Sequence, residues 1–139
     1  VLLAVAIFLG IPSNDTGRDK ALDDGQVAWS APALSDLRAR GEPVFVDVTA
    51  DWCITCLANE AAVLFTPSMK TAFAEADIPY MIADWTDYDP AIGEFVQSHG
   101  RSGIPLYVMY PSGVSSEPII LPQLLTQDMV LEAIEMARR

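Results

Sequence analysis

Two cysteines are the side chains of this sequence best suited to covalent chemistry. They form the segment Cys53-Ile54-Thr55-Cys56, and no other cysteine occurs among the 139 residues. Two thiols at this spacing can close a disulfide, and a thiolate can attack the disulfide of another protein. The pair follows a strand-like run, 44–49, and opens a helical pattern. Because a helix N-terminus stabilises a thiolate, we expect Cys53 to be the nucleophile and Cys56 to resolve the mixed disulfide.

Two other interpretations of the pair are a static disulfide and half of a zinc site. A static bridge across so short a loop restricts the unfolded chain little and therefore contributes little stability. Zinc needs about four ligands, whereas the chain offers two Cys and one His. Redox chemistry explains the pair best, and it needs no metal and no cofactor other than the Cys53–Cys56 disulfide itself.

Two carboxylates accompany the cysteines. Asp47 lies six residues before Cys53 in an otherwise apolar strand, where burial would raise the pKa of its carboxyl group. It could then exchange a proton with Cys56. Glu60 lies four residues after Cys56, on the same helix face, and could tune the same proton. The alternatives are an exposed acid at a strand edge for Asp47 and a solvated helix residue for Glu60.

Apolar periodicity, caps and turn residues predict the elements that position these groups. The helix after Cys53 shows apolar residues at intervals of three and four, namely Ile54, Leu57, Ala58, Ala61 and Phe65. The remaining expected elements are a helix over 33–40, strands over 44–49, 78–85, 106–110 and 117–121, and helices that begin behind Thr66, Asp89 and Thr126. Strands joined by helices pair in parallel and the closing hairpin is antiparallel, so we expect an α/β fold. Its mixed central sheet should have about four to five strands, with helices on both faces.

Composition indicates one folded, acidic domain. The chain is 51% hydrophobic, which excludes a disordered acidic tail despite a formal net charge of -11. So negative a charge also argues against nucleic acid as a partner, because that affinity comes largely from cationic side chains.

The N-terminal segment differs from the rest of the chain. Residues 1–12 are apolar and uncharged, too short to span a bilayer, which takes about 20 residues. We interpret them as the C-terminal part of a transmembrane helix, with a buried strand or helix of the domain as the alternative. Residues 13–28 then form a linker and residues 29–139 the folded domain. The acidic excess after the apolar run favours a non-cytoplasmic side.

The segment 46–56 resembles the strand-to-active-site segment of the thioredoxin superfamily, and 103–107 resembles its cis-proline loop. The resemblance implies a thioredoxin fold. It also implies that Pro105 is preceded by a cis peptide bond and that Ile104 and Pro105 face the cysteines and bind the partner's backbone. An ordinary trans proline is the alternative. We expect Trp52 to shield the disulfide and contact partners, or alternatively to fill the core.

A narrower resemblance is to the C-terminal domain of DsbD-type transmembrane thiol:disulfide interchange proteins, carried by segments 50–56, 59–60, 83–86 and 106–108. It implies a protein-disulfide reductase anchored in the inner membrane through its N-terminal segment and facing the periplasm. The electron donor would be a membrane-embedded dithiol domain, and the acceptors would be extracytoplasmic disulfide proteins. The resemblance also implies the proton-tuning role of Glu60. Ile54 and Thr55 depart from the family's usual intervening pair, which leaves the potential open. An oxidant or isomerase of the same superfamily and a non-catalytic binding module are the alternatives.

Overall fold

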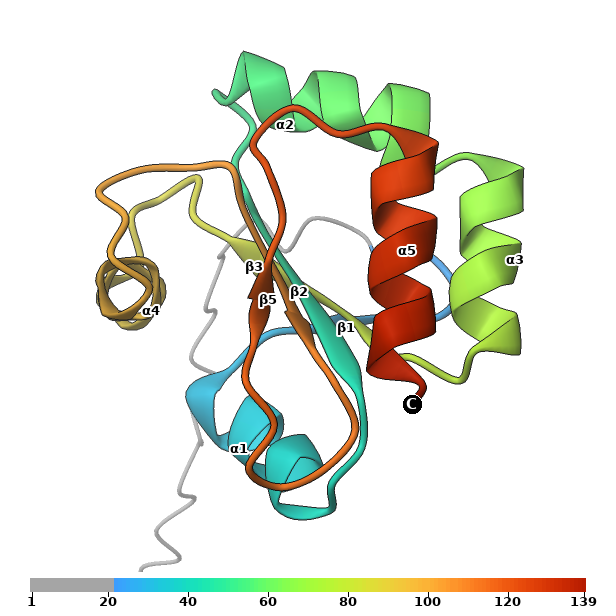
Figure 1. Ribbon diagram of the computed structural model, residues 1–139. Coiled ribbons are helices and arrows are strands. Elements are labelled where there is room, and N and C mark those ends of the chain that lie inside the picture. The colour runs from blue at the N-terminus through green and yellow to red at the C-terminus, as the bar shows by residue number, and fades with distance from the viewer. Residues whose placement is uncertain (1–21) are drawn as a thin grey trace, which may run out of the picture.

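The computed structural model describes residues 22–139, so the expected membrane segment 1–12 and the expected linker up to residue 21 lie outside the described residues. A five-stranded mixed sheet in the order β1-β3-β2-β4-β5 forms the centre, and helices cover both of its faces, as predicted (Figure 1). Among the helices of this part of the chain, none has the length and apolar character needed to cross a membrane. The elements are β1 (Gln26–Ala28), α1 (Ala31–Ala39), β2 (Val44–Thr49), α2 (Ile54–Asn59), the π-helical turn η1 (Glu60–Leu64), α3 (Pro67–Glu75), β3 (Tyr80–Asp84), α4 (Pro90–Ser98), β4 (Leu106–Tyr110), β5 (Ile119–Ile120) and α5 (Gln127–Ala137).

The strand β1 lies inside the segment predicted to be a linker. It pairs in parallel with β3, with Gln26 opposite Tyr80, and it adds three residues to the folded body before the predicted start at Trp29. The sequence pattern does not show this strand because an edge strand of three residues is too short to display alternation. The boundary between linker and folded body therefore lies earlier than predicted.

The helices begin at the predicted capping residues. The side-chain oxygens of Thr66, Asp89 and Thr126 accept backbone N–H groups from the first turns of α3, α4 and α5. Ser30 caps α1 in the same way, so that this helix begins two residues before the predicted 33. Gly100 ends the α4 segment with a φ of 70°, in the left-handed region that a residue without a Cβ adopts without strain.

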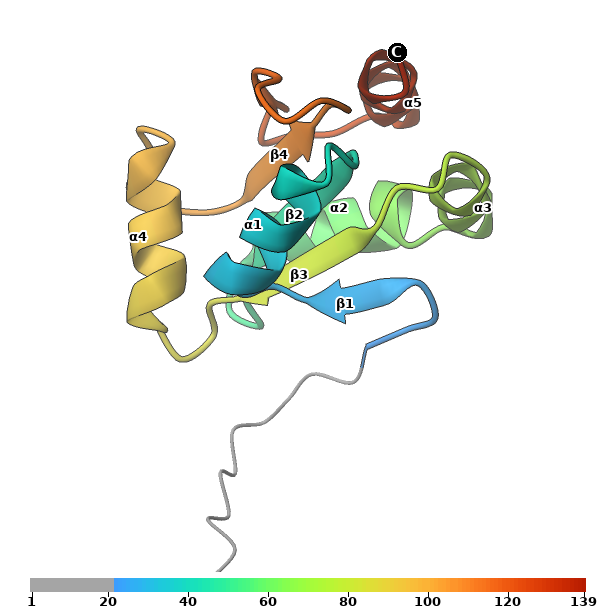
Figure 2. The same cartoon turned by 90° about the horizontal axis from the view of Figure 1, so that it is seen from below.

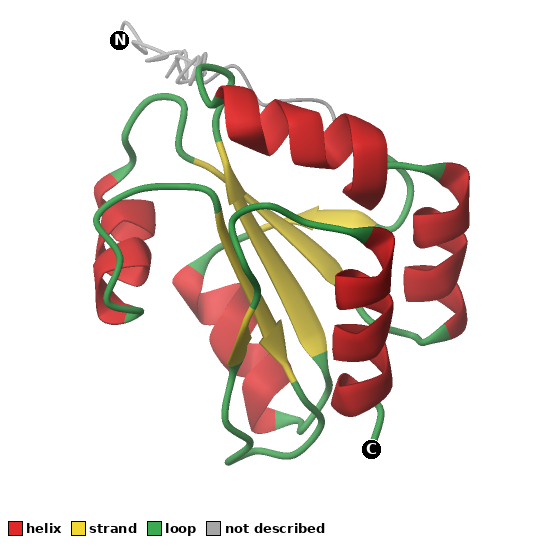
Figure 3. Ribbon diagram, turned by 45° about the horizontal axis from the view of Figure 1, so that its top comes forward, coloured by secondary structure: helices red, strands yellow, loops and turns green. Residues whose placement is uncertain are grey.

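The strand directions bring three connections to one edge of the sheet. β2 is parallel to β3 and antiparallel to β4. The carboxyl ends of β2 and β3 and the amino end of β4 therefore share an edge, at which α2 begins (Figure 3). The turn 50–53, the loop 85–89 and the loop 99–105 meet there, so this edge positions the predicted site.

The two faces of the sheet carry separate parts of the core. α3 and α5 lie on one face and α4 on the other (Figure 2). Side chains of β2 alternate between the faces: Phe45 belongs to the cluster under α3 and α5, whereas Val46 belongs to the cluster under α1 and α4. The side chains of Asp47 and Thr49 point to the same face of the sheet as that of Phe45, and all residues of β2 are buried. A carboxylate and a hydroxyl thus lie inside the face that also receives α2 and η1.

Three of the four tyrosines are buried, and burial raises the pKa of each phenol above its usual 10.0. The pKa of Tyr80 is raised further by the negative charge of Asp47, and so is that of Tyr107. Burial raises the pKa of Tyr110 to about 12, although the Arg38 guanidinium, 4.6 Å from the ring centre, opposes the rise. The folded protein therefore keeps these phenols protonated at a pH where the unfolded chain ionises them.

We predict that the free energy of unfolding falls as the pH rises above 10, because the unfolded state then binds fewer protons than the folded state. Replacing Tyr110 by Phe should make the decline shallower by up to about 1.4 kcal/mol per pH unit. Urea unfolding between pH 8 and about 11 measures this slope. Tyr88→Phe is the matched control, because Tyr88 is exposed. An identical slope in the Tyr110 variant and the parent would contradict the prediction.

Candidate active site

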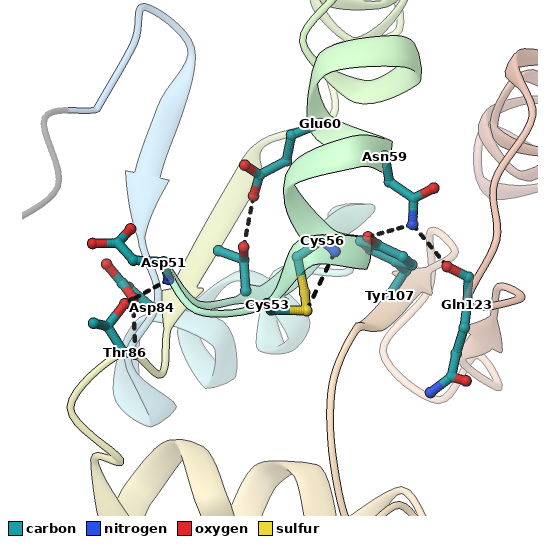
Figure 4. Close-up of a disulfide and its surroundings, with 10 residues drawn as sticks. Asp51, Cys53, Cys56, Asn59, Glu60, Asp84, Thr86, Tyr107 and Gln123 are labelled. Carbon is teal, nitrogen blue, oxygen red and sulfur yellow. Dashed lines mark hydrogen bonds between the residues drawn. A yellow bond between two sulfur atoms is a disulfide. The ribbon is translucent and has the colours of Figure 1, made fainter.

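Cys53 and Cys56 are joined by a disulfide at the start of α2, with their Cα atoms 5.2 Å apart (Figure 4). Cys53 is the N-cap residue of α2, and its Sγ accepts the N–H of Cys56 at 3.2 Å. Cys53 keeps 7% of its surface exposed, whereas Cys56 keeps 0%. A partner disulfide can therefore reach only the first sulfur directly, in agreement with Cys53 as the predicted nucleophile.

The helix after Cys53 turns its apolar residues outward over its first turns. Ile54 is 83% exposed and Leu57 40% exposed, and the inward side chains are instead Cys56, Asn59 and Glu60. The apolar periodicity therefore identifies this helix correctly but does not mark its buried side. The exposed apolar residues lie beside the disulfide, on the surface that a partner must approach.

Asn59 fixes α2 to the second half of the domain. Its amide nitrogen donates to the Tyr107 hydroxyl at 3.0 Å and to the Gln123 carbonyl oxygen at 2.7 Å. Its amide oxygen accepts the N–H of Leu125 at 3.2 Å. These bonds join α2, β4 and the segment before α5, as the dashed lines to Tyr107 and Gln123 in Figure 4 show.

Glu60 is buried and bonded to the sheet. It begins η1, where the N–H of Phe65 donates to the Glu60 carbonyl oxygen at 2.8 Å, a π-type spacing. The Thr49 hydroxyl at the end of β2 donates to Oε1 of Glu60 at 2.7 Å. The solvated position considered as an alternative is therefore wrong, and Glu60 shares the inward side of the helix with Cys56, as predicted. Its role in proton transfer stays a prediction.

Asp47 is fully buried in the central strand β2, so the strand-edge alternative is also wrong. The Tyr80 hydroxyl on β3 donates to Oδ2 of Asp47 at 2.7 Å. The negative charges of Asp47 and Glu60 both raise the pKa of Tyr80 and that of Tyr107. The two predicted carboxylates are thus both buried and each accepts a hydroxyl from the sheet. We call Asp47, Thr49, Glu60 and Tyr80 the buried polar layer, which lies beneath the helix that carries Cys56.

Trp52 lies at the surface, 46% exposed, which excludes the alternative that it fills the core. Its Nε1 donates to the Thr86 carbonyl oxygen at 3.1 Å. The N–H of Asp51 donates to Oγ1 of Thr86 at 2.9 Å, and the Thr86 hydroxyl donates to the Asp84 carboxylate (Figure 4). The loop after β3 is therefore attached to the turn that holds Cys53.

The peptide bond between Ile104 and Pro105 is cis, as the resemblance implied. Ile104 packs against the small cluster formed by Ala50 and the two cysteines, and Pro105 is buried. Both residues therefore belong to the surroundings of the disulfide. Their contact with a partner's backbone stays a prediction.

The sequence assigned no role to four residues of this site, which act through hydrogen bonds. Three of them bond to predicted residues, whereas Asn59 bonds to residues of β4 and of the segment before α5. Each is polar or aromatic within or beside a strand or helix, a weak signal until its partner is known. They are Thr49, Asn59, Tyr80 and Thr86. In residues 22–139 there is also no cluster of three or more His, Cys, Asp or Glu that could hold a metal ion.

Known proteins are similar to this chain in sequence and in fold. A family model described as thioredoxin-like matches residues 26–112. The thiol:disulfide interchange protein DsbD 1 of Pseudomonas aeruginosa is 30% identical over 81 residues, which make up 58% of this chain and 13% of that protein. The aligned part is thus a small fraction of that relative's length.

Solved structures agree with the fold. The C-terminal domain of Neisseria meningitidis DsbD superposes in its reduced form with a TM-score of 0.61 at 22% identity, covering 80% of this chain and 99% of that one. The oxidised form of the same domain superposes with a TM-score of 0.63 at 21% identity, covering 81% of this chain and 98% of that one. A thioredoxin from Thermus thermophilus superposes with a TM-score of 0.61 at 20% identity, covering 80% of this chain and 85% of that one. These similarities confirm the thioredoxin fold predicted from the sequence.

We predict that Asn59→Ala lowers the free energy of unfolding by about 3 kcal/mol, because it leaves several buried polar groups without partners. Chemical denaturation of the oxidised protein measures this change. Gln123→Ala is the matched control, since Gln123 bonds to Asn59 through its backbone carbonyl and its truncation should change stability by less than about 0.5 kcal/mol. Equal stability of the Asn59 variant and the parent would contradict the role given to this amide.

Proposed function

This chain belongs to the thioredoxin-like family, and on that premise we propose that it is a protein-disulfide reductase working through Cys53 and Cys56. With its DsbD-like sequence and its Cys53–Cys56 disulfide, it is a thiol–disulfide oxidoreductase whose partners are themselves redox proteins of the thiol–disulfide kind. The observation that carries the proposal is the asymmetry of the pair, in which Cys53 reaches the surface and Cys56 lies fully buried behind it.

The reaction follows from that asymmetry. In the reduced domain the Cys53 thiolate attacks one sulfur of a partner disulfide, and the other partner sulfur leaves as a thiolate that takes up a proton. Cys56 then loses its proton and attacks Sγ of Cys53, which forms the Cys53–Cys56 bond and releases the second partner sulfur. Two electrons pass to the partner, whose two sulfurs end as thiols. This cycle needs no diffusible cofactor.

The second step requires a group that accepts the proton of a buried thiol. Water has little access to Cys56, whereas Asp47 and Glu60 lie in the polar layer beneath its helix. We assign proton acceptance to these carboxylates, with the Tyr80 and Thr49 hydroxyls holding one each in place. Ile104 and Pro105 would align the partner's backbone beside Cys53, where Ile104 packs.

The donor and the location belong to the same proposal. We assign re-reduction of the domain to a membrane-embedded dithiol domain and electron acceptance to extracytoplasmic disulfide proteins. The domain would face the periplasm, tethered to the inner membrane through residues 1–12. Support comes from the similarity to a DsbD protein and from the uncharged, apolar composition of that segment.

Replacing Cys56 by Ser should trap partners as mixed disulfides on Cys53, because the resolving thiol is then missing. Incubating the reduced variant with an extracytoplasmic extract and separating the products on non-reducing gels measures the trapping. Cys53→Ser is the matched control and should trap far less, since Cys56 is inaccessible. Recovery of no adducts by the Cys56 variant would contradict the relay.

The direction of electron flow has its own test. Thioredoxin-type dithiols range in reduction potential from about -270 mV in reductants to about -120 mV in oxidants. Equilibrating the domain with glutathione buffers measures its position, and a value near the oxidising end would indicate an oxidant or isomerase instead. A non-catalytic binding module would reduce insulin no faster than dithiothreitol alone.

We predict that Asp47→Asn slows disulfide exchange at neutral pH by about tenfold or more without unfolding the domain. The amide can still accept the Tyr80 hydroxyl, but it cannot take up a proton. Stopped-flow rates across a pH series and titration of Cys56 measure the effect. Asp36→Asn, an exposed site on α1, makes the same charge change as a control. Unchanged rates and an unchanged Cys56 titration would show that Asp47 accepts no proton.

A further inference from the structure

Two aromatic rings form an exposed platform beside the reactive sulfur. Trp52, which directly precedes Cys53, stacks on Tyr88 with ring centres 5.4 Å apart and an interplanar angle of 16°. Tyr88 is 61% exposed and Trp52 46% exposed. This exposure is unusual, because large aromatic side chains usually bury their rings in the protein interior. We call this pair the aromatic platform. A partner chain bound at Cys53 must pass close to it.

The loop 85–89 holds the platform in a defined position. The carbonyl oxygen of Thr86 accepts the Nε1–H of Trp52, and its Oγ1 accepts the N–H of Asp51. Because of these two bonds, the loop cannot move independently of the active-site turn. The Trp85 ring meets Tyr88 edge-on at 5.3 Å. Tyr88 has a φ of 57°, a left-handed conformation that is costly for a side chain of this size. The platform is therefore pre-organised, which reduces the ordering needed to bind a side chain.

Both residues that flank Tyr88 in the chain are acidic. Asp87 and Asp89, on either side of Tyr88 in the chain, are both exposed. The stretch 71–100, which contains the whole loop, has no Lys and no Arg, and the chain carries a net charge of -11. An exposed π face flanked by carboxylates attracts a cation and disfavours an anion.

We propose that the aromatic platform, with Asp87 and Asp89, binds a Lys or Arg side chain next to the attacked cysteine of the partner. The proposal rests on the proposed reductase function and gives its substrate class: disulfides with a basic residue beside the cysteine. Because Trp52 adjoins Cys53, the cation on the platform belongs to a residue close to the cysteine in the partner's chain. The ring face and the carboxylates together make Tyr88 a specificity-determining residue.

Three synthetic disulfide peptides test this preference. They are identical except that the residue after each cysteine is Lys, Ser or Glu. Second-order rate constants for their reduction by the full chain, pre-reduced and kept in mild detergent, are measured at low and high salt. We expect the Lys peptide to react about tenfold faster than the Glu peptide at low salt, with the ratio shrinking at high salt.

Two variants connect the preference to the platform. Tyr88→Leu keeps an apolar side chain but removes the π face, and Asp87→Asn removes a flanking charge. Each should lower the Lys-to-Glu rate ratio by about threefold. Asp36→Asn removes one charge from α1, which lies toward the opposite end of the sheet from the start of α2, and should leave the ratio unchanged (Figure 1).

The outcomes separate the two proposals. Equal rate constants for the three peptides, with normal reduction of the Ser peptide, would overturn the platform proposal and leave the reductase function standing. A Lys preference that Tyr88→Leu and Asp87→Asn leave unaltered would also overturn it, because the preference would then arise elsewhere. Reduction of none of the peptides would overturn the reductase function and the platform proposal together.

Discussion

The helix that begins at Cys53 is bound to the sheet by buried polar side chains, and most features of the site depend on this attachment. Asn59 bonds to Tyr107 and to two backbone groups near α5, while Glu60 receives the hydroxyl of Thr49. Buried polar groups are costly unless they are paired, so these bonds permit one orientation of the helix. That orientation places Cys56 inside and directs the apolar residues Ile54 and Leu57 toward solvent.

The same attachment joins the chemistry of the sulfurs to the interior of the sheet. A buried thiol needs a nearby proton acceptor, and the inward side of the helix faces the layer that contains Asp47 and Glu60. Each carboxylate is held by a hydroxyl from a neighbouring strand, Tyr80 for Asp47 and Thr49 for Glu60. On the outer side, Thr86 connects the exposed Trp52 to the loop after β3, and Ile104 packs against the disulfide. The disulfide thus lies between the buried layer to which we assign proton transfer and the exposed surface to which we assign partner binding.

Much of the fold and of the site was predictable from the sequence because strand patterns and helix caps are local signals. The β-branched run of β2 has the same bounds in the sequence pattern and in the structure, and Thr66, Asp89 and Thr126 begin helices as predicted. Burial of Asp47 was predictable because a strand with apolar residues on both of its faces is buried on both sides, and so is any acid within it. The edge strand β1 was missed because three residues carry no periodicity, and its position depends on pairing with β3, far along the chain.

The sequence by itself determined that two cysteines open a helix after a buried strand, and therefore that the chain carries a thiol–disulfide pair. It also determined the alternation of strands and helices that leads to a mixed sheet. Only the tertiary structure decided which side of the α2 helix faces inward. Apolar spacing favours the side of the helix that carries Ile54 and Leu57. The opposite side faces inward because Asn59 and Glu60 find their hydrogen-bond partners on β2, β4 and the segment before α5. The tertiary structure likewise placed Tyr88 against Trp52, since residues 36 positions apart meet only after β2 and β3 pair side by side.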